Sequence, residues 1–268
     1  MGSKTVAFVA NKGGVGKTRQ SILLANCLGK LGYKTGLLDM DFNNSSTGYY
    51  AKADHANLIK HKNIAMAMAN PEHTLSDFAI PSDHENVSFV ASSRYLCDLR
   101  AVSVYRLKEI ISNTSEFDYI IIDCQPNYDN LTLNAINASD WIITPVLKDT
   151  DSKGAADFLQ EKLIAETNKY DNWFITINRY NHNIADAKTG KQKEYIDMYL
   201  ESFQGHITPR ETWFPDTPLM NDIKDRQLLL AEKEKIPGTV CQPQLYSAVL
   251  NLAECFLDAE ITTHPEAF

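Results

Sequence analysis

The sequence lacks paired cysteines, long apolar runs and an excess of positive charge. Its five cysteines are odd in number and none lies in a C-x-x-C pair, which disfavours disulfides and zinc and favours reduced thiols in a cytoplasm. No apolar run approaches the roughly 18 residues of a membrane span, and no secretory signal pattern is present. With 26 Lys and Arg against 34 Asp and Glu, the net charge of −8 does not indicate nucleic-acid binding. We therefore expect a cytoplasmic protein with no membrane partner.

Short apolar segments alternate with helical patterns along the chain. The predicted strands are residues 5–10, 34–40, 87–90, 119–123, 141–146 and 173–178. Helical patterns of about 12 to 15 residues between them indicate βαβ units. The fold class is therefore α/β, with a doubly wound, mostly parallel sheet flanked by helices. The 268 residues fit a single domain, 1–268, with helical insertions near 42–81 and 181–205.

A glycine-rich segment at residues 11–18, Asn-Lys-Gly-Gly-Val-Gly-Lys-Thr, joins the first predicted strand to the first predicted helix. That context is typical of a phosphate-binding loop, where backbone N–H groups and the positive end of a helix dipole meet the phosphate. Lys17 can reach the β- and γ-phosphates, and the Thr18 hydroxyl is a ligand for Mg²⁺. The loop residues expected to bind the nucleotide are Gly13, Gly14, Val15, Gly16, Lys17 and Thr18.

Three carboxylates stand at the ends of predicted strands. Asp39 and Asp41 are two residues apart, so on the period of a strand they point the same way. Asp123 ends the most apolar strand of the chain. Ligands of parallel sheets bind at the carboxyl ends of the strands, so all three carboxylates are expected near the loop. The alternative for Asp39 and Asp41 is that both are solvated loop carboxylates.

The segment from Lys12 to Thr18 resembles the deviant phosphate loop of the ParA/MinD-type ATPases, since Asn11 replaces the usual first glycine. Residues 37–41 and 117–126 resemble the first switch and the second nucleotide motif of that family. The resemblance implies a P-loop NTPase that binds ATP and Mg²⁺, hydrolyses ATP slowly and dimerises with ATP bound.

The resemblance also implies roles for individual residues. Lys12 would contact the nucleotide of the partner subunit, while Lys17 would contact the nucleotide bound to its own subunit. Asp41 would position and deprotonate the attacking water, and Asp39 and Asp123 would support the metal.

Several positions depart from the family pattern. Phe42-Asn43 replaces Pro-Gln, and Gln125 stands where a proline is common. Arg19 replaces a hydroxyl residue, and its guanidinium could lie along the α-phosphate or face solvent. Asn178 and Arg179 resemble the position that reads the base, because an amide offers the donor and acceptor that adenine demands. A simple turn asparagine is the competing interpretation.

The partners follow from the branch of the family that the chain resembles. Residues 254–268 contain no Lys or Arg, unlike the membrane-docking helix of MinD-type members. The ParA branch implies a homodimer that partitions DNA or positions cargo, with a centromere-binding or adaptor protein that stimulates hydrolysis. Non-specific DNA, which would make the protein nucleoid-associated, could contact Lys188, Arg210, Lys224 and Arg226, although neighbouring acids make a solvated face an equal alternative. A ligase-like or metal-insertion ATPase on the same fold is the other function left open.

Overall fold

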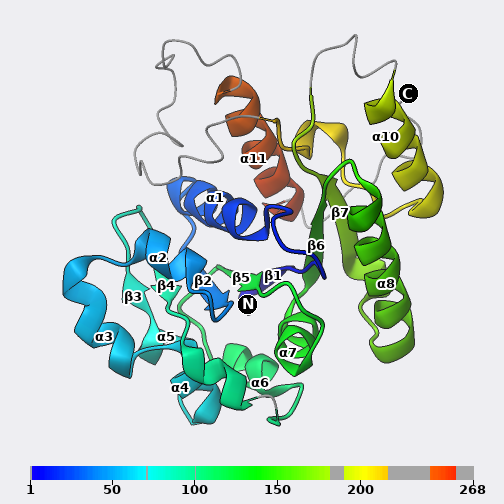
Figure 1. The fold of residues 1–268 in the computed structure, drawn as a ribbon. Helices are drawn as coiled ribbons and strands as arrows, with labels where there is room; N and C mark the ends of the chain where they lie inside the picture. The colour runs from blue at the N-terminus through cyan, green and yellow to red at the C-terminus, as the bar shows by residue number, and fades with distance from the viewer. Residues whose placement is uncertain (1, 71, 100, 182–189, 217–241, 258–268) are drawn as a thin grey trace.

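The computed structural model describes all residues except 1, 71, 100, 182–189, 217–241 and 258–268 (Figure 1). A seven-stranded sheet has the order β3-β4-β2-β5-β1-β6-β7. Every neighbouring pair is parallel except β3 and β4, which are antiparallel. The strands are β1 (Lys4–Phe8), β2 (Thr35–Met40), β3 (Ile80–Pro81), β4 (Val87–Val90), β5 (Tyr119–Cys124), β6 (Trp141–Val146) and β7 (Trp173–Ile177). The predicted fold class is confirmed.

Helices cover both faces of the sheet (Figure 1). The α-helices are α1 (Lys17–Lys30), α2 (Ser45–Tyr50), α3 (Ala56–His61), α4 (Ile64–Ala69), α5 (Leu75–Phe78), α6 (Arg106–Ser112), α7 (Asn130–Ala138), α8 (Thr150–Glu166), α10 (Lys191–Ser202) and α11 (Gln242–Leu257). Short 3₁₀ helices are η1 (Ala53–His55), η2 (Arg94–Leu99), η3 (Tyr170–Asn172) and η4 (Arg210–Thr212). No helix in the described ranges is long and apolar enough to cross a bilayer.

The core divides into two layers because successive side chains of a strand point to opposite faces. In β5, Ile121 packs in the layer with α1 and α11, whereas Ile120 and Ile122 pack in the layer with α4, α6, α7, α8 and α10. In β1, Phe8 and Ala7 divide between the layers in the same way. Both faces of these central strands are buried, which explains their continuous apolar runs.

The helix that follows the glycine-rich segment, α1, ends at Lys30, two residues before Gly32. Gly32, with φ 97°, takes the left-handed conformation, and the N–H of Tyr33 donates to the carbonyl of Leu28 at 3.1 Å. This is the pattern of a helix stop that favours glycine. The next strand, β2, therefore starts close to the end of α1 and returns the chain to the glycine-rich edge of the sheet.

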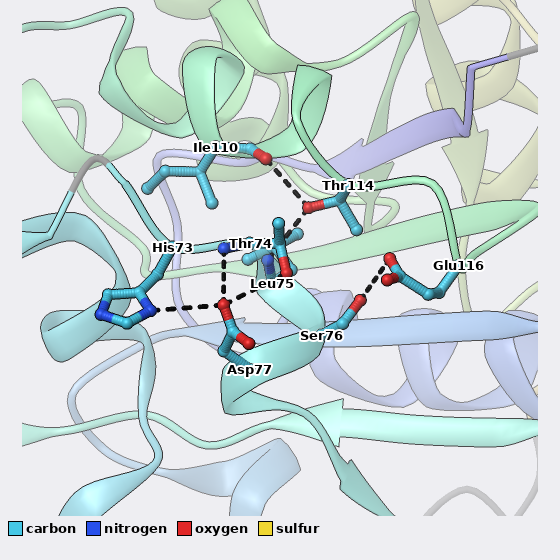
Figure 2. Close-up of polar contacts among 8 residues, drawn as sticks. All are labelled: His73, Thr74, Leu75, Ser76, Asp77, Ile110, Thr114 and Glu116. Atoms are coloured by element: carbon cyan, nitrogen blue, oxygen red, sulfur yellow. Dashed lines mark hydrogen bonds and ion pairs between the residues drawn. The ribbon is translucent and has the colours of Figure 1, made fainter.

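A buried threonine connects the segment at 42–81 to the layer of α6 (Figure 2). The Thr114 hydroxyl accepts a hydrogen bond from the N–H of Leu75 at 3.0 Å and donates one to the carbonyl of Ile110 at 2.9 Å. The carboxylate of Asp77 accepts from the N–H of Thr74 at 2.9 Å, which caps α5. Leu75 and Phe78 then enter the core.

Helix α10, in the predicted insertion at 181–205, also packs on the sheet. Ile196, Tyr199 and Phe203 of this helix are buried in the same layer as α8. The Tyr199 hydroxyl donates to the carbonyl of Leu147, just after β6, at 2.9 Å. The helix thereby supports the chain that leads from β6 into α8.

Candidate nucleotide-binding site

The glycine-rich segment forms a loop between the carboxyl end of β1 and the start of α1. Gly16, with φ 108°, is the N-cap residue of α1. A Cβ at this position would lie 2.3 Å from Nδ2 of Asn178, so only glycine fits. A Cβ at Gly13 or Gly14 would meet no atom within 4 Å, so these two positions border open space. The loop can therefore admit a ligand at its glycines while its other side packs on the sheet.

Lys17 lies inside this loop. Its ammonium donates to the carbonyl of Ala10 at 3.2 Å and to the carbonyl of Lys12 at 3.0 Å. Burial lowers the pKa of Lys17, and the nearby carboxylates of Asp123 and Asp41 oppose that shift. The hydrogen bonds of this ammonium go to neutral carbonyl groups, which an anion such as a phosphate can replace with stronger, charge-assisted ones.

Asp39 and Asp123 face each other across neighbouring strands. They are register partners in the β2–β5 pair and are 1% and 0% exposed, respectively. Burial raises the pKa of Asp39 to about 8, and the charge of Asp123 adds to that shift. Burial likewise raises the pKa of Asp123 to about 6, although the Ser46 and Thr18 hydroxyls and the Lys17 ammonium oppose it.

The hydrogen bonds of the two carboxylates differ. Asp39 accepts from the N–H and the hydroxyl of Thr47, each at 2.7 Å, and from the N–H of Asp41 at 3.1 Å. Asp123 accepts from the Ser46 hydroxyl through Oδ2, while its Oδ1 has no hydrogen-bond partner within the described ranges. Oδ1 of Asp123 is thus an orphaned buried acceptor at the edge of the loop.

Asp41 lies at the mouth of the same cluster. It is 8% exposed, and its Oδ1 accepts hydrogen bonds from the backbone N–H and side-chain amide of Asn43, each at 2.9 Å. Its charge acts on both Lys17 and Asp123. The structure therefore brings together the loop and all three carboxylates that the sequence singles out.

Lys12 points to a different place. Its ammonium donates to Oδ1 of Asp149 at 2.7 Å and to the Ser152 hydroxyl at 3.2 Å. Asp149 is the N-cap residue of α8 and also accepts from the N–H of Ser152 at 2.7 Å. Burial tends to raise the pKa of Asp149, but these hydrogen bonds outweigh it and leave that pKa below its usual value. In this structure Lys12 binds its own chain.

Asn178 braces the loop from β7. Its Nδ2 donates to the carbonyl of Val15 at 2.7 Å, and its Oδ1 accepts from the N–H of Arg179 at 2.9 Å. Arg179 has the left-handed φ of 54°. Burial and the nearby charge of Arg179 lower the pKa of Arg19, so the two guanidinium groups are neighbours on this side of the loop.

Comparison with known proteins places the chain in a family. A family model described as AAA domain matches residues 3–176. The sporulation initiation inhibitor protein Soj of Bacillus subtilis is 32% identical over 229 residues, which cover 80% of this chain and 87% of Soj. The chain belongs to the ParA/MinD-type P-loop ATPases.

Solved structures share the fold. A plasmid partition protein from Borrelia burgdorferi has a TM-score of 0.71 at 21% identity, covering 97% of this chain and 100% of that one. Cobyrinic acid a,c-diamide synthase from Mycobacterium smegmatis, with bound ADP and magnesium, has a TM-score of 0.73 at 17% identity and covers 98% and 100%. At these identities the likeness concerns the fold alone.

The residues of this ParA/MinD-type chain fit a magnesium nucleotide. No group of three or more His, Cys, Asp or Glu side chains in the described part of the chain could hold a metal by itself. Mg²⁺ usually takes one or two carboxylates and completes its shell with phosphate oxygens and water. The orphaned Oδ1 of Asp123, with the hydroxyls of Thr18 and Ser46 near that carboxylate, matches such a donor set.

The candidate DNA-binding residues are not brought together within the described ranges. Lys188, Lys224 and Arg226 lie outside them. Arg210 donates through Nη2 to the Tyr180 hydroxyl, and its guanidinium carbon lies 5.1 Å from the centroid of the Tyr180 ring. Part of the hydrogen-bonding capacity of Arg210 is therefore used within the protein.

Sequence reasoning missed several residues of the site. Ser46 and Thr47 begin α2 and hold the two buried carboxylates, and the run of three hydroxyl residues at 45–47, shortly after Asp41, was the available signal. Asp149 was signalled only by the N-cap pattern of an aspartate that precedes Thr150. Gln20, a polar residue within an apolar helix, gave no comparable signal.

We predict that Asp123→Asn stabilises the nucleotide-free protein at pH 8 more than at pH 5. The folded-state pKa of Asp123 lies above its unfolded value, so its burial costs stability as pH rises from about 4 through about 6. Asparagine removes that cost, which is on the order of 3 kcal/mol at pH 8. Urea denaturation of wild type and Asp123→Asn at pH 8 and at pH 5 measures the change in unfolding free energy.

Asp77→Asn is the control, because Thr74 lowers the pKa of Asp77 through a backbone hydrogen bond. Asp77 therefore contributes stability above its pKa, and its replacement should destabilise the protein at pH 8. If Asp123→Asn and Asp77→Asn shifted stability in the same direction at pH 8, the account of Asp123 would be wrong.

Proposed function

We propose that the protein binds ATP with Mg²⁺, hydrolyses it slowly and uses its nucleotide state to control dimerisation in the partition of DNA or the positioning of cargo. The observation that carries this proposal is the meeting of the loop lysine, Lys17, with the carboxylates of Asp123 and Asp41 at one edge of the sheet. Membership of the ParA/MinD-type ATPases supports it.

Each part of the site has a role in this proposal. The loop from Gly13 to Thr18 and the start of α1 hold the phosphates, with Lys17 against the β- and γ-phosphates. Thr18 and Asp123 hold Mg²⁺, with Asp39 in support. When bound, the metal neutralises charge on the phosphate oxygens. Asn178, Arg179 and Arg19 flank the base and the α-phosphate.

Asp41 is the base in this proposal. A carboxylate that is buried, charged and near the phosphates can orient a water molecule and accept its proton. The two hydrogen bonds from Asn43 hold Oδ1 and leave Oδ2 of Asp41 for that water. Asn43 stands where the family commonly has glutamine, so the switch keeps an amide beside the catalytic carboxylate.

Lys12 completes the site of a second subunit in the proposed dimer. To do so it must leave Asp149 and Ser152, since its ammonium binds them in the single chain. Its side chain and that of Asp149 are 23% and 39% exposed, and an ion pair at such exposure contributes little stability, typically about 0–1 kcal/mol. A phosphate of the partner's nucleotide could therefore displace it.

The cargo is inferred from the relatives. Two relatives named for chromosome partitioning, Soj of Treponema pallidum and ParA of Myxococcus xanthus, are 34% and 32% identical over 53% of this chain, which favours partition over a synthase activity. An adaptor or centromere-binding protein would then stimulate hydrolysis. A rise in ATPase rate with a basic partner peptide would separate this function from that of a metabolic enzyme.

Lys17→Ala should abolish binding of a fluorescent ATP analogue. The substitution removes the one buried ammonium of the loop, and charge-assisted hydrogen bonds are the strong ones in a phosphate site. Lys30→Ala, at the far end of the same helix, is the matched control and should bind like wild type. If wild type and Lys17→Ala bound the ATP analogue with equal affinity, the assignment of residues 11–18 as a phosphate-binding loop would be wrong.

A mixture of Lys12→Ala and Asp41→Ala should regain ATPase activity that neither variant has alone. In the mixed dimer, the subunit that keeps Asp41 receives Lys12 from its partner. At equal amounts, half of the dimers are mixed and each has one complete site, so about a quarter of wild-type activity is expected. If Lys12 acted within its own chain, mixing would restore nothing.

The ATP-bound dimer is also proposed to bind duplex DNA without sequence preference. Dimerisation places two copies of any basic strip on one face, and local potential rather than the net charge of −8 governs the encounter. Gel shifts of ATP-bound Asp41→Ala should show a complex, with a log–log salt slope near −3.6 if roughly four phosphates are neutralised. The absence of any shift at ~50 mM salt would remove DNA from the proposed function.

A further inference from the structure

Gln20 is a fully buried side chain with neither end of its amide satisfied. It is 0% exposed, and within the described part of the chain neither Oε1 nor Nε2 has a hydrogen-bond partner. Buried polar groups are almost always paired, and each exception in a native protein needs an explanation. A glutamine offers one acceptor and two donors, so a matching group of a bound ligand would satisfy it.

The place of Gln20 in the fold points to the nucleotide. Its backbone N–H donates to the carbonyl of Gly16 at 3.0 Å, so it lies one turn into the helix that starts at the phosphate loop. A Cβ on Gly16 would lie 3.8 Å from Nε2 of Gln20 and 2.3 Å from Nδ2 of Asn178. The two side-chain amides therefore converge on the same side of the loop.

Only Gln20, of these two amides, lacks every hydrogen bond within the described residues. Asn178 donates through Nδ2 to the carbonyl of Val15 and accepts through Oδ1 from the N–H of Arg179. Arg19 and Arg179, which neighbour each other on this side of the loop, are cations, which suit phosphate oxygens better than a neutral base. Within the described residues, Gln20 is thus the amide beside the loop whose donor and acceptor groups are both unpaired.

We propose that Gln20 is a specificity-determining residue that reads the adenine base of the bound nucleotide. This inference rests on the proposed ATP binding. A glutamine amide pairs with adenine by accepting from the N6 amino group and donating to N7. Hypoxanthine and guanine carry a carbonyl oxygen at position 6, so their N7 edge presents two acceptors and leaves Oε1 of the amide without a donor.

The test uses Gln20→Met, which keeps the length of the side chain and removes the amide. Since the variant no longer buries two unpaired groups, the melting temperature of the nucleotide-free protein should rise by about 2–4 °C. The Kd for ATP should rise about tenfold, because a hydrogen-bonded group of the ligand loses its partner. The preference of wild type for ATP over ITP, measured by displacement of a fluorescent analogue, should fall to near unity.

Gln160→Met is the matched control. Gln160 lies on α8 and its Nε2 donates to the Tyr170 hydroxyl at 2.9 Å, so this glutamine is paired within the protein. Its replacement should lower the melting temperature and leave the preference for ATP over ITP unchanged. 7-Deaza-ATP, which lacks N7, should bind wild type more weakly than ATP but bind Gln20→Met equally well.

The possible results separate this inference from the proposed function. A lower melting temperature for nucleotide-free Gln20→Met would mean that the amide is paired in the free protein, and would overturn the inference. An ATP-to-ITP preference equal to that of wild type would overturn it as well. In both cases ATP binding that depends on Lys17 would still stand. A wild-type protein that binds no ATP would overturn both.

Discussion

The burial of two carboxylates side by side is the constraint on which the site depends. Asp39 and Asp123 meet because β2 pairs with β5 in a register that sets one against the other. Their mutual repulsion and desolvation are opposed by hydroxyls of α2 and by the ammonium of Lys17. The loop, the first turn of α2 and the ends of two strands are therefore coupled through one cluster of charge, and any cation that enters changes the balance for all of them.

Local pattern was enough to predict six of the seven strands of the sheet, all except β3. The apolar run Tyr119–Ile122 becomes β5 because both faces of a central parallel strand are buried. The glycines between the first strand and helix become a loop because Gly14 and Gly16 take positive φ values of 75° and 108°, which favour glycine. These features depend on residues that are close together in the sequence, so local sequence patterns predict them.

Other features depend on the order of strands and could not be predicted. That Asp39 lies opposite Asp123 follows from the insertion of β5 between β1 and β2, which no local pattern encodes. The attachment of Lys12 to Asp149 and the bracing of Val15 by Asn178 join segments far apart in the chain. Ser46 gained its role only because α2 folds back over the end of β5.

The position of β1 has a consequence for how the protein is made. The strand that leads into the phosphate loop is synthesised before the other strands of the sheet, yet Lys4 pairs with Tyr119 and Val6 with Trp141. Both neighbours of β1 are thus synthesised much later, and long-range pairing of this kind is slow to form. During synthesis, β1 and the loop that follows it can take their folded positions only after β5 and β6 have been made. The proposed binding of a nucleotide thus requires a chain whose central strands have already assembled.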